Sequence, residues 1–527
     1  MSTATLPTSS SPKTRFRHFK KEEVGLGLVA LVFLAVTIRA AWLRPLVFHE
    51  FSTLFVASTP TMREMFRAIP ADGNPPLYFL LVRLGLYLSI KTELAVRLPA
   101  IISYLFAALT VHWFVRRDAG STAAWLAMSI FLGCSIHFYS IDGRPYSLLL
   151  FLTGLTLCCW QSYCRSGDRL ALAGLVLSIA GAIYAHQYGV IYVMSVLFAG
   201  EEVRSVRRRR FDPAILIAAA MGGLTILLTA PPMLRGQELL LQAISASPVF
   251  AWHPRLSDLK DYGELLPIFV PSLVFLAFLG LLLKVALSPR NEPKVEAAGV
   301  PIGSEVPIED IAATAALALM LPVILIITHI GSNYFQLRYG IGSAMGISLL
   351  CGLLLPRLRW RHAASLALVA TIYCFLVGLL GLGLAAKPRR ELWWTDPMLH
   401  AGNADEPIVI ANAVRFPPIW WYSDVETRAK LHYLTDLTYA GKQSGLVPEY
   451  SLALERDYTP MRLDDYQTFL ADHRRFLLYC TGEPYLEWVK QRLMHEGWHL
   501  RLLQSAPAIK LPKDEEQPYR ELYEVSR

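Results

Sequence analysis

Long runs of apolar residues constrain the fold of this chain more than any other feature. A helix needs about 20 mostly apolar residues to cross a bilayer. Of the 527 residues, 54% are hydrophobic and only 17% are charged, whereas soluble domains carry charge on about a quarter of their residues. The sequence therefore predicts a polytopic membrane protein with about eleven spans, at 24–46, 96–115, 120–139, 146–164, 169–185, 188–201, 213–231, 265–286, 309–329, 340–356 and 362–386.

The placement of basic residues orients these runs across the membrane. Short cytoplasmic loops collect Lys and Arg, and basic stretches at 13–21, 116–117 and 204–210 border the runs on one side. Topology thus explains the net charge of +8, and we predict no nucleic-acid partner. A further apolar segment, 75–90, opens with two prolines and contains Arg83. The positive-inside rule holds if this segment lies along the outer interface as an amphipathic helix.

The composition changes after Lys387, where polar and aromatic residues mix and no run long enough for a span remains. "EPIVIANA" (406–413), "HRRFLLYCT" (473–481) and "WHLRLLQS" (498–505) have the pattern of short strands. "PYLEWVKQRLMHEG" (484–497) has the pattern of an amphipathic helix. This alternation predicts a small Rossmann-like α/β layer, although no Gly-rich phosphate loop is present.

The N-terminal apolar run has no small-residue cleavage site after it, so we expect a membrane helix and not a cleaved signal peptide. The seven cysteines are scattered and have no zinc-site spacing. The predicted fold is mainly α, a polytopic membrane helix bundle with interfacial helices and a small extracytoplasmic α/β domain. Its predicted parts are a cytoplasmic basic N-terminus at 1–23, the bundle at 24–386 with a first outer loop at 47–95, and the soluble domain at 387–527.

Two acidic motifs lie on the predicted outer side. Glu50 follows His49 directly after the first apolar run, and Asp72 stands with Asn74 in the stiff turn "DGNPPLY". A carboxylate at the membrane interface can act as a general base when a cation or hydrogen-bond donor holds it. Taken singly, the same residues also fit a helix cap and an ordinary Asp-Gly turn, so both interpretations stay open.

Two arginines lie on the same predicted side, Arg144 in "DGRPYSLLL" and Arg338 in "QLRYG". Arginine binds phosphate through two points and does not lose its charge, although an interfacial arginine can also extend to lipid headgroups. His186 and Tyr188 occupy the tight turn "AHQYG". Carboxylates and arginines together suit transfer from a phosphate-activated donor, because a base deprotonates the acceptor while cations balance the leaving phosphate.

A transporter or lipid flippase is the main alternative function. Transporters tend to show internal repeats and charged groups near the middle of the bilayer. Here no repeat is visible, and the charged groups gather at one predicted surface. The pattern therefore favours an enzyme.

In the order of its motifs, the chain resembles the GT-C class of membrane glycosyltransferases, which use polyprenyl-phosphate sugars. The nearest resemblance is to the protein-mannosyltransferase-like and aminoarabinose-transferase-like group, over about residues 24–360. The matching elements are "HE", "DGNPPLY", the basic pair 116–117, Arg144-Pro145-Tyr146, "AHQYG" and Arg338-Tyr339.

This resemblance implies an inverting hexosyl- or pentosyltransferase that moves a sugar from a polyprenyl-phosphate donor to a glycan, lipid or protein acceptor. It also implies a multi-pass protein of the plasma membrane (the bacterial inner membrane), embedded in lipid, with its site facing the periplasm or outside.

One position departs from the family pattern, because the first acidic residue is His49 here. Either Glu50 or Asp72 replaces it as the base, or His49 is itself the base, or the protein is an inactive GT-C-like scaffold. We favour Glu50 as base with Asp72 assisting, and Arg144 and Arg338 on the donor phosphate. No cofactor is required in this interpretation, and no metal is predicted, although some relatives use a divalent metal. The expected substrate-binding residues are Asn74, Tyr78, Asp142, Tyr146, His186, Tyr188 and Tyr339.

Overall fold

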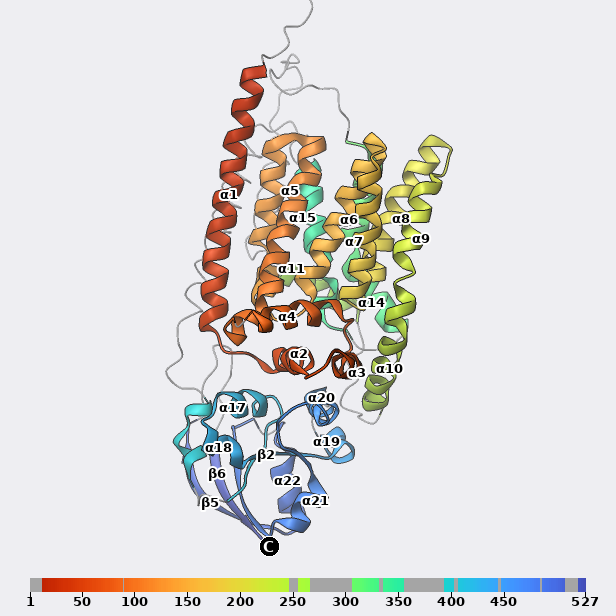
Figure 1. The fold of residues 1–527 in the computed structure, drawn as a ribbon. Coiled ribbons are helices and arrows are strands. Elements are labelled where there is room, and N and C mark those ends of the chain that lie inside the picture. Colours follow the sequence, from red (N-terminus) through yellow and green to blue (C-terminus); the bar gives the residue numbers. More distant parts are fainter. Residues whose placement is uncertain are drawn as a thin grey trace, which may run out of the picture.

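The protein consists of a helix bundle and a small α/β domain that lies against one end of it (Figure 1). This computed structural model describes residues 12–88, 90–245, 255–265, 306–330, 335–354, 393–401, 406–443, 447–483, 486–507 and 520–527. The long helices of the bundle run side by side, while three short helices lie across the end that faces the small domain.

The bundle is built from helices that coincide with the predicted apolar runs. They are α1 (Pro12–Leu43), α5 (Thr92–Gly133), α6 (Tyr146–Ser166), α7 (Arg169–Ala185), α8 (Gly189–Arg208), α9 (Pro213–Gly223), α10 (Ile226–Ser245), α13 (Ile308–Ala318), α14 (Met320–Ile330) and α15 (Gly342–Leu354). Short turns of helix at η1 (Ser135–Ile141), η3 (Leu256–Asp261), α11 (Tyr262–Leu265) and η4 (Leu337–Gly340) accompany them.

Four helical segments in the described part of the chain are long and apolar enough to cross a membrane, and two bent pairs raise the number to six. The bent pairs are α9 with α10 (43°) and α13 with α14 (50°). The predicted runs 265–286 and 362–386 fall outside the described residues, apart from residue 265, so the total of eleven spans stays a prediction.

Helix α5 is two predicted spans joined without a loop. Gly120 breaks it with a φ of 83°, a conformation that glycine adopts without steric cost. The chain then doubles back, since Tyr104 Oη donates a hydrogen bond to the carbonyl oxygen of Phe131 (3.1 Å) and the two rings stack at 4.9 Å. The predicted span 120–139 was too long, because the α-helix ends at Gly133 and η1 follows.

The helical structure also extends beyond the predicted apolar run 213–231. Helix α10 continues to Ser245, although its sequence turns polar after Pro232. The polar residues end the apolar run but not the helix, because this part of α10 packs on the first loop. A Cβ atom on Gly236 would lie 2.6 Å from the carbonyl oxygen of Pro70, so the two backbones meet there.

Three short helices cover the end of the bundle: α2 (Phe48–Ser58), α3 (Met62–Asp72) and α4 (Leu77–Tyr87). The segment predicted to lie along the interface is α4. Its Arg83 is buried and donates to the carbonyl oxygens of Ala57 (3.2 Å) and Thr59 (2.7 Å) at the end of α2. The arginine therefore binds carbonyl groups that have no partner within helix α2, and it fixes α4 to the end of α2.

The C-terminal domain contains a six-stranded sheet in the order β3-β2-β1-β4-β6-β5. The first four strands are parallel, and β6 pairs antiparallel with β4 and β5. The strands are β1 (Ile408–Ile410), β2 (Leu431–Thr435), β3 (Leu463–Asp465), β4 (Arg475–Cys480), β5 (His499–Ala506) and β6 (Arg520–Ser526). The helices are α17 (Phe416–Tyr422), α18 (Val425–Lys430), α19 (Leu437–Gln443), α20 (Val447–Glu455), α21 (Tyr466–Asp472) and α22 (Trp488–His495).

The predicted strands β1, β4 and β5 and the predicted helix α22 are confirmed, whereas β2, β3 and β6 were not anticipated. The domain meets the bundle through an aromatic contact. Trp421 of α17 lies 6.2 Å from Phe51 and 6.3 Å from Phe55 of α2, measured between ring centroids. Tyr422 Oη accepts a hydrogen bond from the backbone N–H of Leu46 (2.8 Å).

Candidate active site

The carboxylate of Glu50 is enclosed by hydrogen-bond donors. Arg97 donates to it through Nε (2.7 Å) and Nη2 (2.5 Å), and both side chains are 1% exposed. The backbone N–H groups of Val47 (2.9 Å) and Gly143 (2.8 Å) complete the set. Glu50 stands at the third position of α2, where a glutamate can reach back to the start of the helix. A substrate would have to displace one of these donors to reach it.

Arg97 joins the first loop to the bundle. Besides Glu50, its guanidinium donates to the backbone carbonyl oxygens of Ala41 (3.0 Å), Arg44 (2.5 Å) and Pro45 (2.8 Å). Arg97 was not predicted as a site residue, because it lies at the start of a predicted span. An arginine within an apolar run was the available signal, since such a charge is costly without a partner.

Gly143 brings the "DGR" turn onto Glu50. A Cβ atom at this position would lie 2.4 Å from Cγ1 of Val96 and 3.2 Å from Oε1 of Glu50. Only glycine lets the backbone approach this closely. Its two neighbours, Asp142 and Arg144, are thereby placed beside α2.

Arg144 and Asp72 form a buried ion pair. Arg144 Nη1 donates to the Asp72 carboxylate, to Thr53 Oγ1 (3.2 Å) and to the carbonyl oxygen of His49 (3.3 Å). Asn74 Nδ2 donates to the other Asp72 oxygen (2.7 Å), and the Asp72 side chain is 1% exposed. Each Asp72 oxygen thus accepts one hydrogen bond from a protein donor, and the carboxylate holds Arg144 in place.

His49 and Asp142 form a second, more accessible pair. His49 Nε2 lies 2.9 Å from Asp142 Oδ1, and the side chains are 38% and 18% exposed. Burial opposes ionisation of Asp142, but His49, Arg144 and Arg338 together hold its pKa below the usual value. A carboxylate that accepts the Nε2–H group leaves Nδ1 of the imidazole as a hydrogen-bond acceptor.

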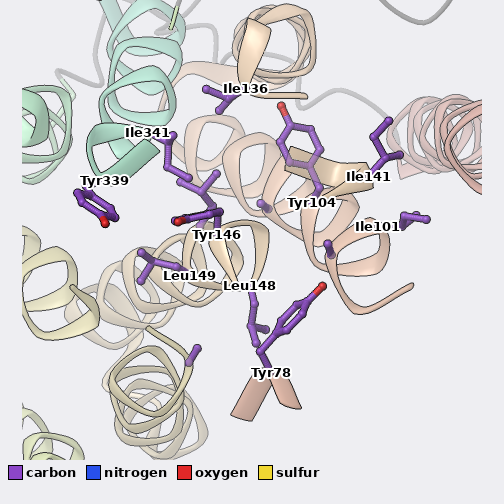
Figure 2. Packing of buried hydrophobic residues seen from close by; sticks show 14 of the residues in the cluster. Tyr78, Ile101, Tyr104, Ile136, Ile141, Tyr146, Leu148, Leu149, Tyr339 and Ile341 are labelled. Atoms are coloured by element: carbon purple, nitrogen blue, oxygen red, sulfur yellow. The ribbon is translucent and has the colours of Figure 1, made fainter. Parts of the chain in front are cut away.

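Arg338 of η4 lies among aromatic rings on the other side of the site. Its guanidinium is 5.8 Å from the ring centre of Tyr146 and 6.0 Å from that of Tyr339. Tyr188 lies 4.8 Å from Tyr339, and His186 lies 5.2 Å from Tyr146. Figure 2 shows Tyr146 and Tyr339 among the buried residues of the core. The aromatic faces hold the cation at the end of the bundle.

His186 is a buried neutral donor. The backbone N–H of Tyr188 donates to its Nδ1 (3.1 Å), so the ring proton must reside on Nε2. The residue is 1% exposed, and Nε2 meets no hydrogen-bond partner within the described residues. Burial, with Arg144 and Arg338 nearby, lowers the pKa of His186 to about 3. The imidazole is therefore uncharged at neutral pH.

Further buried polar atoms in this region have no partner within the described part of the chain, among them Asn74 Oδ1 and Arg144 Nε. Such an atom costs about 1–3 kcal/mol when nothing satisfies it, so we expect these atoms to bind water or a ligand. Tyr78 differs from these, because its Oη donates to the carbonyl oxygen of Val96 (3.0 Å).

The structure thus brings all the predicted site residues together at one end of the bundle, from four separate parts of the chain. They are His49, Glu50, Asp72, Asn74, Tyr78, Asp142, Arg144, Tyr146, His186, Tyr188, Arg338 and Tyr339. Among the described residues, no group of three or more His, Cys, Asp or Glu side chains is arranged to hold a metal ion.

Comparison with known proteins gives a match to one family model and to solved structures. A family model described as dolichyl-phosphate-mannose-protein mannosyltransferase matches residues 73–233, a segment that contains Arg144 and His186. No curated protein sequence matches the chain.

Among solved structures, ArnT from Cupriavidus metallidurans in the apo state matches with a TM-score of 0.52 at 13% sequence identity, covering 95% of this chain and 98% of that one. The structure of the same protein bound to undecaprenyl phosphate gives a TM-score of 0.49 at 14% identity, covering 95% and 97%. The resemblance indicated by the motifs is confirmed, and the chain has the fold of the GT-C class of membrane glycosyltransferases.

Proposed function

We propose that this protein transfers a sugar from a polyprenyl-phosphate donor to an acceptor hydroxyl group on the extracytoplasmic side of the membrane. The observation that carries the proposal is the pairing of His49 with Asp142 directly beside the Arg144–Asp72 ion pair. A base and a phosphate-binding cation are the two groups that this transfer needs. The family match names a lipid phosphate sugar, dolichyl-phosphate-mannose, in its description, which supports this class of donor.

The geometry favours His49 as the base over Glu50 and Asp72. Both carboxylates are 1% exposed and already accept hydrogen bonds from arginines, whereas the His49 side chain is 38% exposed. Asp142 orients the imidazole and stabilises the imidazolium that forms when it takes a proton, as the acidic member of a catalytic triad does. The departure from the family pattern at position 49 therefore replaces one kind of base by another.

Arg144, Arg338 and His186 are suited to the donor phosphate. Two of these groups are cations, and the third offers an uncharged N–H donor that meets no partner within the described residues. Arg144 is fixed by Asp72, Thr53 and the His49 backbone. These donors would balance the charge that develops on the leaving phosphate without rearrangement.

The proposed step is a single inverting displacement. The acceptor oxygen forms a bond to the anomeric carbon while its proton passes to His49 Nδ1. The bond between the anomeric carbon and the phosphate oxygen breaks, and its electron pair stays on the polyprenyl phosphate. The proton taken by the imidazole is then released to water.

The test is transfer by purified protein in lipid nanodiscs, with radiolabelled polyprenyl-phosphate hexoses and pentoses as donors and water or octyl glycosides as acceptors. His49→Gln should lower kcat about 10²–10⁴-fold, as expected for loss of a general base. Arg338→Ala should abolish turnover with every acceptor, including water. An inactive wild-type protein on all donors, or a fully active His49→Gln variant, would contradict the proposal.

A further inference from the structure

The C-terminal domain contributes side chains to the part of the site nearest Asp72. Helix α20 packs against α3 and ends at Glu455. The Glu455 carboxyl group accepts a hydrogen bond from Ser52 Oγ of α2, and the residue is 2% exposed. Tyr458, in the turn that follows, packs on the small apolar cluster formed by α2, α3 and α4. The domain therefore reaches into the first loop.

Glu455 presents a neutral acid to this region. In the described part of the structure it takes part in no salt bridge, and Ser52 donates to one of its oxygens. Burial raises the pKa of Glu455 to about 8, and the Asp72 carboxylate adds to the shift, while Ser52 and Arg144 oppose it. At neutral pH the carboxyl group is mostly protonated, and its second oxygen can donate a hydrogen bond.

Two buried polar atoms near Glu455 are available for hydrogen bonds to a ligand. Tyr458 Oη and Asn74 Oδ1 both lack a hydrogen-bond partner among the residues that the structure describes, and Asn74 is 5% exposed. Both residues lie close to Asp72: Asn74 donates to its carboxylate, and the Asp72 charge acts on the Tyr458 hydroxyl. The donors and acceptors offered here are uncharged, and they are what a polyhydroxylated molecule would satisfy.

This region lies within reach of the proposed base. His49, Ser52 and Thr53 occupy positions i, i+3 and i+4 of α2, so they share one face of the helix, with about 5–6 Å between Cβ atoms. Ser52 bonds to Glu455 and Thr53 to Arg144. A hydroxyl group held at Glu455 would therefore sit about one sugar ring away from His49.

We propose that Glu455 and Tyr458 of the C-terminal domain, together with Asn74, bind the hydroxyl groups of the acceptor, which is consequently a sugar-like molecule. This inference rests on the proposed transferase function. It makes the C-terminal domain part of the acceptor site, whereas the donor phosphate is handled by Arg144, Arg338 and His186. Glu455 does not touch the reacting atoms and acts as a specificity-determining residue.

The experiment separates the acceptor from the donor by using two readouts on the full-length protein in nanodiscs. Hydrolysis of the radiolabelled polyprenyl-phosphate sugar reports the donor half of the site. Transfer of the label to a panel of octyl hexosides reports the acceptor half. Glu455→Ala should raise KM for the octyl hexoside about ten-fold, the value of one lost hydrogen bond of ~1.4 kcal/mol, and leave hydrolysis within about two-fold. Glu455→Gln should restore the KM, because an amide also donates from a neutral group.

Glu449→Gln provides the matched control. Glu449 is a second buried glutamate of α20, also 2% exposed, but it bonds to Trp488 inside the domain. Its substitution should leave both readouts unchanged. Equal loss of hydrolysis and transfer in Glu455→Ala, or an unchanged KM, would overturn the inference and leave the proposed function standing. Hydrolysis by the wild type without transfer to any hexoside would overturn the inference that the acceptor is a sugar-like molecule. Absence of both reactions in the wild type would overturn the proposed function and the inference with it.

Discussion

Arg97 and Glu50 are joined by two hydrogen bonds, of 2.7 and 2.5 Å, in an environment where each side chain is only 1% exposed. This ion pair connects the long α5 helix to the start of α2, and its other donors reach the end of α1. The carboxylate that the motif comparison singled out as a base is thus the centre of the first loop's attachment to the bundle.

We expect Glu50→Gln to destabilise the protein strongly. It leaves the Arg97 cation buried without its counter-charge, a change that costs about 3–5 kcal/mol in other proteins. Thermal unfolding of the detergent-solubilised protein should show a clearly lower midpoint. His49→Gln should instead unfold at the wild-type temperature while losing turnover.

Glu64→Gln is the matched control for this measurement. Glu64 is exposed and completes the capping box of α3 with Thr61, a role that glutamine also fills. It should change the midpoint little. If Glu50→Gln were as stable as Glu64→Gln and still inactive, Glu50 would again be the favoured candidate for the general base.

Gly143→Ala should disturb the site without changing any polar group. The added methyl group would meet Val96 at 2.4 Å and Glu50 at 3.2 Å, and overpacking of this kind costs about 1–3 kcal/mol. We expect a lower unfolding midpoint and reduced donor hydrolysis, since Asp142 and Arg144 would both be displaced. Gly27→Ala, where nothing lies within 4 Å of the added atom, should show neither effect.

The Arg144–Asp72 pair allows stability and activity to be separated. Arg144→Ala strands a carboxylate that is 1% exposed, so we expect a lower unfolding midpoint and loss of donor hydrolysis. Adding Asp72→Asn removes the stranded charge and should recover most of the stability, because the remaining groups are neutral. Hydrolysis should stay lost in the double variant. Recovery of hydrolysis would show that Arg144 serves the fold and not the donor phosphate.

Stability should fall as pH rises through the range in which Glu455 ionises. Burial raises its pKa in the folded protein to about 8, from its ordinary value of 4.5. Because the pKa of Glu455 is higher in the folded protein than in the unfolded chain, its contribution to stability is complete at pH values below the pKa of the unfolded chain. This contribution is lost as the pH rises through the pKa of the folded protein. Each such carboxyl changes the unfolding free energy by at most ~1.4 kcal/mol per pH unit between these values.

Glu449 must be included in this experiment, because burial also raises its pKa to about 8. Unfolding midpoints measured between pH 6 and 9 should decline most steeply in the wild type, less steeply in Glu455→Gln, and least in the double variant with Glu449→Gln. Asp72, Arg144 and Tyr458 lie near Glu455 and are unchanged in all three proteins. Identical slopes would show that Glu455 is ionised in the folded state.

The sequence predicted the fold well where one physical signal dominates. Apolar runs identified the bundle helices, and the positive-inside rule separated segment 75–90, which forms the short helix α4, from the predicted spans. The prediction was wrong where a helix continues through polar residues, as in α10, which stays helical beyond its apolar part. The strand β2 was missed because a short buried strand and a buried helix segment share the same composition. The strands β3 and β6 were missed because charged residues interrupt their apolar pattern.

The residues predicted for the site lie together at one end of the bundle, but the contacts that each of them makes could not be predicted from the sequence. His49 and Glu50 are neighbours in the chain, and nothing in the motif shows that one faces Arg97 and the other Asp142. That division depends on long-range contacts with residues 97 and 142–143. Glu455 was beyond reach for the same reason, since Ser52 lies about four hundred positions away.

The arrangement of α2 also has a consequence for how this protein can vary. One face of an eleven-residue helix carries His49, Ser52 and Thr53, while Glu50 points to Arg97. Each residue added to a helix rotates everything after it by about 100°. A one-residue insertion or deletion directly after Glu50 would therefore turn the contacts to Arg144 and Glu455 away from their partners, and no single substitution could restore them. Among homologous chains, this short stretch should tolerate exchange of side chains but not a change in length.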